Sequence, residues 1–374
     1  MVISRILNKK SIILFTILII ILISIILLKQ TSVVNVFSVD DSLDKDGLTE
    51  AHIGELFDIR TSAYLNADVD LLESLYHTEL RNGQLAFENE HTKLIYINAW
   101  ADKHQATFHK VDSYIATRRI EEIEKDKYSV SLAVSTEYTY AYNDQADIET
   151  SFRIGSYHTM EFIKKDGNWL VTKEWYGDPF GAFLQIDDLA KVQDIISSGV
   201  KPDLSDLNER RLGAVDYANK HSGVARPPEY SFHYNNEYRN YNGHGGDCTN
   251  FASQVLYEGG DMPKNGSWNY NSGGATAAWV GASPFHNYML YSGRASLIAS
   301  GDHEAVLEHS YGLRPGDYIA YERKGKVAHI SIVTDLDSKG YPLVNSHNTD
   351  RYKVPWDIGW TSKNVKIYLV RVHY

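Results

Sequence analysis

The single cysteine of the chain is the residue whose chemistry stands out first. Cys248 is the only cysteine among 374 residues, which excludes an internal disulfide framework. It lies in the segment DCTNFASQVLYEGG, where apolar residues recur four apart until two glycines end the run. This pattern predicts a helix over residues 249–258, with Cys248 at its first turn and Asp247 as the N-cap. Free backbone N–H groups there favour a thiolate with a lowered pKa and can hold an oxyanion.

A thiol nucleophile needs a base within reach and a group that orients the base. His329 lies in VAHISIVT, a segment with a strong strand pattern, and Asn345 and His347 follow on the next predicted strand. The turn sequence DLDSKGY predicts that the two strands form a hairpin, so that Asn345 or His347 lies beside His329. A buried inert cysteine and a structural histidine remain the alternatives for these residues.

Residues 206–374 resemble the bacterial putative amidase domain family, which is related to the CHAP and NlpC/P60 peptidases of the papain-like group. The segments that carry the resemblance are NERRLGAVDYANK, DCTNFASQVLYEGG, LRPGDYIAY, AHISIVT and VNSHNTDR. The resemblance implies a papain-like α+β fold with Cys248 as nucleophile and His329 as general base. It implies a polar third member on the following strand, for which His347 is the first choice and Asn345 the alternative.

Two bodies of different composition must position these residues. Residues 221–374 carry 14 acidic and 14 basic side chains, so the whole net charge of −11 lies in residues 1–220. Helical periods over 49–76 and 92–103 are followed by four alternating segments at 108–120, 127–142, 152–164 and 169–176. This order predicts an α+β accessory domain over 49–180. The order of two or three helices and four strands resembles that of small NTF2-like or cystatin-like domains. A linker over 181–205 then leads to the amidase-like domain over 206–374.

The amidase-like domain is predicted as one helix, two loop regions around the cysteine helix, and a closing sheet. The helix covers 206–220, and the loops cover 221–246 and 261–300. Four strands are expected at 318–323, 327–334, 342–347 and 365–373. Trp268, Tyr270 and Trp279 fall in the second loop region, where packing is favoured over a role in binding sugar or peptide.

The N-terminus predicts a membrane anchor over residues 1–29. Residues 11–28 form an 18-residue run without a charge, preceded by three basic residues and followed by Lys29. That length spans a bilayer, and the charge asymmetry places the bulk of the chain outside the cytoplasm. Residues 30–48 read as a polar tether. A cleaved signal peptide and secretion are the alternative.

Composition and motifs narrow the function. The acidic balance argues against a nucleic-acid partner, and the six-residue spacing of the histidines in HEAVLEH does not fit a zinc protease. No cofactor or metal is expected. The sequence therefore predicts a membrane-anchored, extracytoplasmic cysteine amidohydrolase or peptidase whose substrate is a peptide or peptidoglycan-like amide. A non-catalytic surface-binding module and an acyl transferase that uses the same Cys248–His329 pair are the alternatives.

Overall fold

The computed structural model describes residues 47–181, 183–224 and 232–374. The predicted anchor and almost all of the tether lie outside this part of the chain. Within the described ranges, no helix combines the length and apolar character needed to cross a membrane. Residues 48–374 form one compact unit of mixed helix and sheet.

The accessory region begins with three helices. The first two lie within the predicted period at 49–76, and the third starts 11 residues before the predicted period at 92–103. They are α2 (Glu50–Asn66), α3 (Val69–Glu73) and α4 (Arg81–His104). Thr49 caps α2, because its side chain accepts from the backbone N–H of His52 while the His52 ring bonds the Thr49 backbone N–H. Capping groups of this kind satisfy backbone donors that a helix leaves free.

Four antiparallel strands follow, close to the predicted ranges: β1 (Ala106–Glu124), β2 (Lys127–Tyr142), β3 (Thr150–Lys165) and β4 (Asn168–Trp175). Alternation along β3 buries Phe152, Ile154 and Met160 on the helix side and leaves Tyr157 38% exposed on the outer side. The outer face of this sheet is therefore available to the rest of the chain.

Buried charges tie the helices to the inner face of the same sheet. Arg60 forms two bonds to Glu174, of 3.0 and 2.7 Å, and the ring of His158 contacts the same carboxylate at 2.7 Å. Burial alone raises the pKa of Glu174, but the charge of Arg60 and the His158 bond hold it well below its usual range. The carboxylate thus stays ionised and fixes β4 against α2.

The C-terminal region contains short helices and the second half of the sheet. After α5 (Leu189–Ser197), its helices are α6 (Glu209–Lys220), the 3-10 turn η1 (Asn242–His244), α7 (Cys248–Gln254), the π-helical turn η2 (Val255–Gly259), α8 (Ala277–Val280), α9 (Ala282–Tyr291) and α10 (His303–Ser310). Its strands are β5 (Tyr270–Asn271), β6 (Gly274–Ala275), β7 (Ala295–Gly301), β8 (Tyr318–Arg323), β9 (Lys326–Leu336), β10 (Pro342–Ser346), β11 (Arg351–Pro355) and β12 (Val365–Val372).

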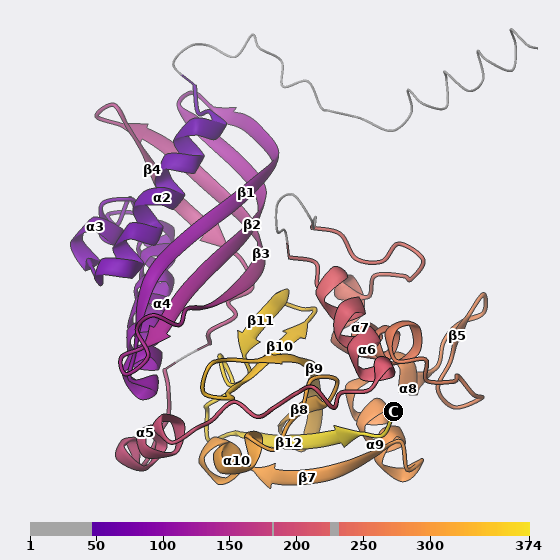
Figure 1. Cartoon of the computed structure of the whole chain (residues 1–374). Coiled ribbons are helices and arrows are strands. Elements are labelled where there is room, and N and C mark those ends of the chain that lie inside the picture. The colour runs from indigo at the N-terminus through magenta and orange to yellow at the C-terminus, as the bar shows by residue number, and fades with distance from the viewer. Residues whose placement is uncertain (1–46, 182, 225–231) are drawn as a thin grey trace, which may run out of the picture. The chain divides into compact units, whose positions relative to one another are not determined.

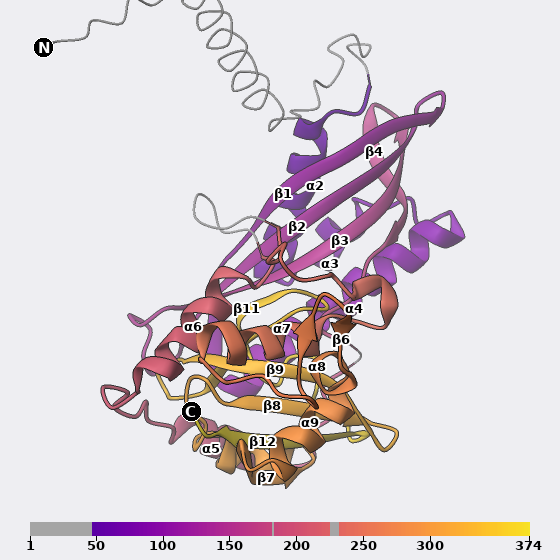
Figure 2. The same ribbon diagram turned by 90° about the vertical axis from the view of Figure 1, so that its right-hand side faces the viewer.

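One sheet runs through both regions, in the order β1-β2-β3-β11-β10-β9-β8-β12-β7 (Figure 1). The junction is short, because β11 pairs with β3 only at Arg351–Ile154 and Tyr352–Arg153. β4 covers the later half of the same edge of β3, from Thr159 to Lys165. Figure 2 shows α6 and α7 beside the strand β9.

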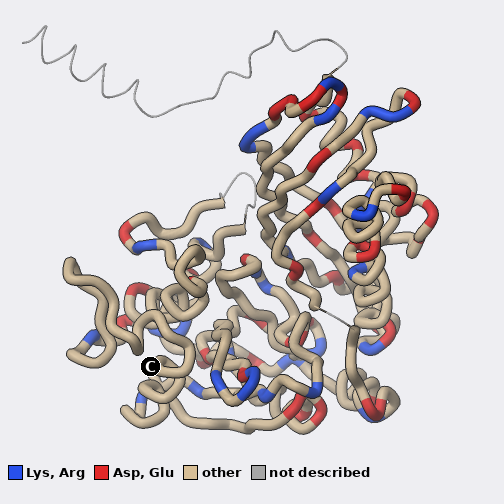
Figure 3. The backbone as a smooth tube through the Cα atoms, turned by 180° about the vertical axis from the view of Figure 1, so that it is seen from behind, with Lys and Arg blue, Asp and Glu red and all other residues tan. Residues whose placement is uncertain are grey.

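Contacts beyond the sheet also join the two regions. Lys103 on α4 forms a fully buried ion pair with Asp357, and the indole N–H of Trp100 donates to the same carboxylate at 3.4 Å. Burial opposes ionisation of Asp357, but the charge of Lys103 holds its pKa well below the usual range. Figure 3 shows Lys and Arg interspersed with Asp and Glu in both regions.

Candidate active site

Cys248 is the first residue of α7, as predicted, and its side chain is 6% exposed. The regular helix is shorter than the predicted one, because a π-helical turn takes over from Val255 to Gly259. Phe251, Ala252 and Val255 pack against α6 and against Ile330 on β9, so the apolar face holds the N-terminus of α7 at the sheet. The thiol sulfur lies 3.7 Å from the hydroxyl of Thr249.

The pKa of Cys248 is raised above its ordinary value, and the expected lowering is not found. Burial is the main cause, and hydrogen bonding from the backbone of Ile330 and Thr249 only partly offsets it. The helix N-terminus stabilises a thiolate through its dipole and its free N–H groups. At a fully buried sulfur, the cost of removing the thiolate charge from water is larger than this stabilisation. The resting group is therefore a thiol whose sulfur lies beside the backbone of the residue after His329.

This protonation state predicts slow alkylation. We expect iodoacetamide to modify Cys248 at pH 7 more slowly than it modifies free cysteine, with a rate that rises about tenfold per pH unit toward pH 9, because only the thiolate reacts. Mass spectrometry of the labelled protein over a pH series measures this. Unfolding in denaturant should restore the rate of a free thiol, and a folded-state rate at pH 7 above that of free cysteine would contradict the raised pKa.

His329 is the fourth residue of β9 and is 5% exposed. Its ring stacks on Trp360 with centroids 5.1 Å apart and lies 5.8 Å from the ring of Tyr321. Its Nε2 is buried without a hydrogen-bond partner among the described atoms. Burial, with the charges of Arg351 and Arg323, lowers its pKa to about 3. The imidazole is therefore neutral, with one nitrogen uncommitted.

The structure brings His347 to Asp247, the residue before the cysteine. Nδ1 of His347 lies 2.6 Å from Oδ2 of Asp247, and Nε2 lies 2.7 Å from the carbonyl oxygen of His221. The ring of His347 therefore links the carboxylate of Asp247 to the backbone of His221. Tyr234 and Phe251 stack on its two faces at 3.5 and 4.2 Å.

The side chain of Asp247 holds the backbone segment before α7 in place and does not cap the helix. Its carboxylate makes no capping bond to α7. Oδ1 instead accepts from the backbone N–H of Tyr241 at 2.8 Å and from the side chain of Asn250 at 3.0 Å. Together with the bond to His347, these contacts fix the backbone immediately before Cys248.

Asn345 makes structural bonds at the end of α6. Its amide donates to the carbonyl of Ala218 at 3.1 Å, and its oxygen accepts from the hydroxyl of Thr334 at 2.8 Å and from the backbone N–H of Lys353 at 2.7 Å. The register pairs Asn345 with Ile332 on β9. Cross-strand partners share a face, so Asn345 lies on the face of Ile332. Ile332 is an odd number of residues from His329, so these two side chains lie on opposite faces of β9.

The placement of the third member therefore differs from the sequence-based expectation. Asn345 lies on the face of β9 that carries Ile330 and Ile332, where α7 packs, and the ring of His329 contacts Tyr321 and Trp360 on the other face. Among the described residues, neither Asn345 nor His347 is hydrogen-bonded to His329, and no such bond joins His329 to Cys248. The stacked rings of Trp360 and Tyr321 orient this imidazole.

A turn after β10 links the cysteine segment to the histidine. The side-chain oxygen of Asn348 accepts from the backbone N–H of Asp247 at 2.6 Å. Asn348 and Thr349 both adopt positive φ, of 66° and 57°, which is costly for a β-branched residue. Both line a cavity of about 290 Å³ that His329, Arg351 and Trp360 also line. The turn therefore contacts the approach to Cys248 on one side and the His329 cavity on the other.

The tryptophans of the second loop region pack, as favoured from the sequence. Trp268 and Trp279 are fully buried. The indole N–H of Trp268 donates to the hydroxyl of Ser253 at 2.9 Å, and that of Trp279 donates to the side chain of Asn250 at 2.9 Å. They stabilise α7 from behind and present no face to a ligand.

Comparison with known proteins supports an amidase-like C-terminal region. Residues 208–370 match the family model described as "Putative amidase domain". An uncharacterized protein of Bacillus subtilis (strain 168), YhbB, is 32% identical over 153 residues, which cover 39% of this chain and 43% of that protein. The chain thus spans less than half the length of this curated relative.

Solved structures give weaker similarities. A scytalone dehydratase candidate from Novosphingobium aromaticivorans is 12% identical, with a TM-score of 0.25 over 34% of this chain and 81% of that chain. An NTF-2 like protein of unknown function from Shewanella oneidensis is also 12% identical, with a TM-score of 0.22 over 35% of this chain and 100% of that chain. Similarities with such low TM-scores carry no argument about this protein.

Proposed function

We propose that the chain is a cysteine amidohydrolase that cleaves an amide bond in a peptide of the peptidoglycan type. The observation that carries the proposal is the position of its only thiol. Cys248 lies at a helix start, against the β9 backbone beside His329, inside the segment that matches an amidase domain. A papain-like arrangement, as in CHAP and NlpC/P60 domains, is part of the proposal.

The proposed reaction begins with transfer of the Cys248 proton to Nε2 of His329. The sulfur attacks the carbonyl carbon, and the backbone N–H of Cys248, which has no acceptor within its helix, donates to the oxyanion. The proton then passes from His329 to the leaving amine as the C–N bond breaks, and water releases the acid. Nε2 of His329 makes no hydrogen bond in the free protein, so no hydrogen bond has to break before it takes the proton.

His347 has a positioning role in this proposal. Its contact with Asp247 holds the segment that leads to the nucleophile, and its contact with the carbonyl of His221 joins that segment to the end of α6. Asn345 supports the same region through Ala218 and Thr334. In the proposed setting, residues 11–28 hold the enzyme in the cell membrane, with the rest of the chain outside the cytoplasm.

The test is cleavage of purified peptidoglycan fragments by the full-length protein. Mass spectrometry of the products should show one amide bond replaced by a carboxylate and an amine. An added amine nucleophile separates hydrolysis from acyl transfer, because a transferase would give a new amide instead of the acid. Absence of any product from wall fragments and from unrelated peptides, with a correctly folded protein, would favour a non-catalytic binding module.

A further inference from the structure

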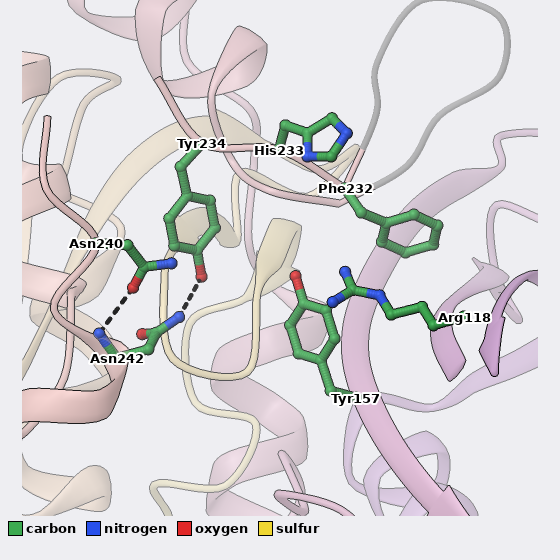
Figure 4. A pocket seen from close by; sticks show the side chains of 7 residues that line it. All are labelled: Arg118, Tyr157, Phe232, His233, Tyr234, Asn240 and Asn242. Atoms are coloured by element: carbon green, nitrogen blue, oxygen red, sulfur yellow. Dashed lines mark hydrogen bonds between the residues drawn. The ribbon is translucent and has the colours of Figure 1, made fainter. Parts of the chain in front are cut away.

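A polar cavity of about 550 Å³ lies between the outer face of the accessory sheet and segment 232–242 of the C-terminal region (Figure 4). Its lining contains one cation, aromatic rings and two side-chain amides. The lining residues are Arg118, Tyr157, Phe232, His233, Tyr234, Asn240 and Asn242. Neither region forms the cavity by itself, because Arg118 and Tyr157 come from β1 and β3 and the other residues come from segment 232–242.

Arg118 is the cation of this cavity. Its guanidinium lies over the ring of Tyr157, 4.8 Å from the centroid. No carboxylate lies within ion-pair distance of Arg118 in the described ranges. The next residue, Arg119, is instead paired with Glu121 at 2.8 Å on the solvent-facing surface. A guanidinium that rests on an aromatic ring and lacks a carboxylate presents a fork of donors to a ligand.

The opposite wall is connected to the candidate active site. The amide of Asn242 donates to the hydroxyl of Tyr234 at 2.9 Å, and that hydroxyl donates to Asp350 at 2.5 Å. The ring of Tyr234 also stacks on His347 at 3.5 Å. The wall thus contacts His347, which also bonds to Asp247 immediately before Cys248.

A second cavity continues toward the nucleophile. It has a volume of about 340 Å³ and shares Tyr157, Tyr234 and Asn242 with the first. Gly245 and Gly246, which lead to Cys248, line its far side with Asn348. Trp175 of β4, 69% exposed, lines it from the accessory sheet. A ligand that extends through both cavities would run from Arg118 to the loop before the cysteine.

We infer that the Arg118 cavity is a substrate subsite that binds a carboxylate of the peptide portion of a peptidoglycan-type substrate. This inference rests on the proposed function. The guanidinium fork matches a carboxylate, the amides of Asn240 and Asn242 match peptide groups, and Tyr157 supplies an apolar surface. The accessory region therefore selects the substrate, whose scissile bond lies further along, near Cys248.

Binding to the inactive Cys248→Ala full-length protein tests the inference without cleavage. The probe is the disaccharide-peptide fraction released from peptidoglycan by a muramidase, and calorimetry measures its Kd. We expect Arg118→Gln to weaken binding about tenfold, in the range of one charge-assisted hydrogen-bond pair. Arg119→Gln is the matched control and should leave Kd unchanged, because Arg119 pairs with Glu121 and does not line the cavity.

Two further probes identify the recognised group. Fragments whose carboxylates have been converted to amides should bind about tenfold more weakly to the Cys248→Ala protein, which is the parent of the Arg118 variants. For these amidated fragments, Arg118→Gln should cause no further loss of affinity. A neutral chitin oligosaccharide should bind weakly to both. Equal affinity of the parent and Arg118→Gln for the native fragment would overturn the inference, as would tight binding of the amidated fragment or of the neutral glycan alone.

The outcomes also separate this inference from the proposed function. Arg118-dependent binding without cleavage by the wild-type protein would refute the amidase and leave the subsite in place. Cleavage with unchanged KM in Arg118→Gln would refute the subsite alone. Arg118→Lys keeps the charge but not the fork of donors, so its affinity for the fragment should lie between that of the protein with Arg118 and that of Arg118→Gln. Near-UV circular dichroism establishes that each variant is folded.

Discussion

Replacement of Cys248 by alanine is expected to abolish amide cleavage, with kcat/KM reduced by roughly 10³-fold or more, the scale of nucleophile loss in related acyl-transfer enzymes. The side chain is small, and among the described residues its thiol has hydrogen-bond partners in a hydroxyl and in backbone groups, so the fold should persist. The measurement is product formation from wall fragments by mass spectrometry, with unfolding transitions compared in parallel.

Cys248→Ser is the matched variant for this experiment. It keeps the size and the hydrogen-bonding capacity of the side chain, but a serine hydroxyl is far harder to ionise next to a weakly basic imidazole. We expect its activity to fall almost as far as that of Cys248→Ala. Near-normal turnover by a stable Cys248→Ala protein would show that the thiol is not the nucleophile.

The second large effect is expected at His329. His329→Ala should lower kcat by roughly 10²- to 10⁴-fold, because His329 directly precedes Ile330, whose backbone lies at the sulfur, and carries a nitrogen without a hydrogen-bond partner that can take the proton. The cavity beside this residue has a volume of about 290 Å³, enough to admit a free imidazole. Added imidazole should therefore restore part of the lost rate, a response that a purely structural histidine would not give.

Variants of the other two candidates provide the contrast. His347→Ala should cost about 10- to 1000-fold in turnover by releasing Asp247, and Asn345→Ala should cost less in turnover but lower the unfolding temperature. Imidazole should rescue neither. A His329→Ala protein with normal turnover, beside a His347→Ala protein that imidazole rescues, would assign the base to His347.

Helices and strands with a hydrophobic pattern that repeats over many residues could be predicted from the sequence. Strands that form only by pairing with residues far away in the chain could not. The alternation of β2 and the helical period of α2 come from local burial, which the sequence displays directly. β7 consists largely of small residues at the sheet edge, and β11 is five residues with a proline. Neither has a pattern that separates it from a loop, and β11 forms only because β3 and β10 lie on either side of it.

The candidate site shows the same division. The N-terminal position of Cys248 on its helix follows from local sequence. The pairing of His347 with Asp247 joins residues 100 positions apart, and burial reverses the sign of the thiol pKa shift expected from the helix alone. Period two places Asn345 and His347 on one face of their strand, but only the register, with its bulge near Val344, decides which residues of β9 share that face.

The short junction between β3 and β11 has a consequence for biosynthesis. β3 ends at Lys165 and β11 begins at Arg351, so at about 5–20 residues per second the ribosome needs roughly 10–40 s to supply the partner strand. During that interval the first half of one edge of β3 has no partner, although the rest of the accessory sheet can form. An open strand edge is a template for pairing with other chains. The nascent chain is therefore most exposed to misassembly, and most dependent on chaperones, between completion of the accessory region and emergence of β11.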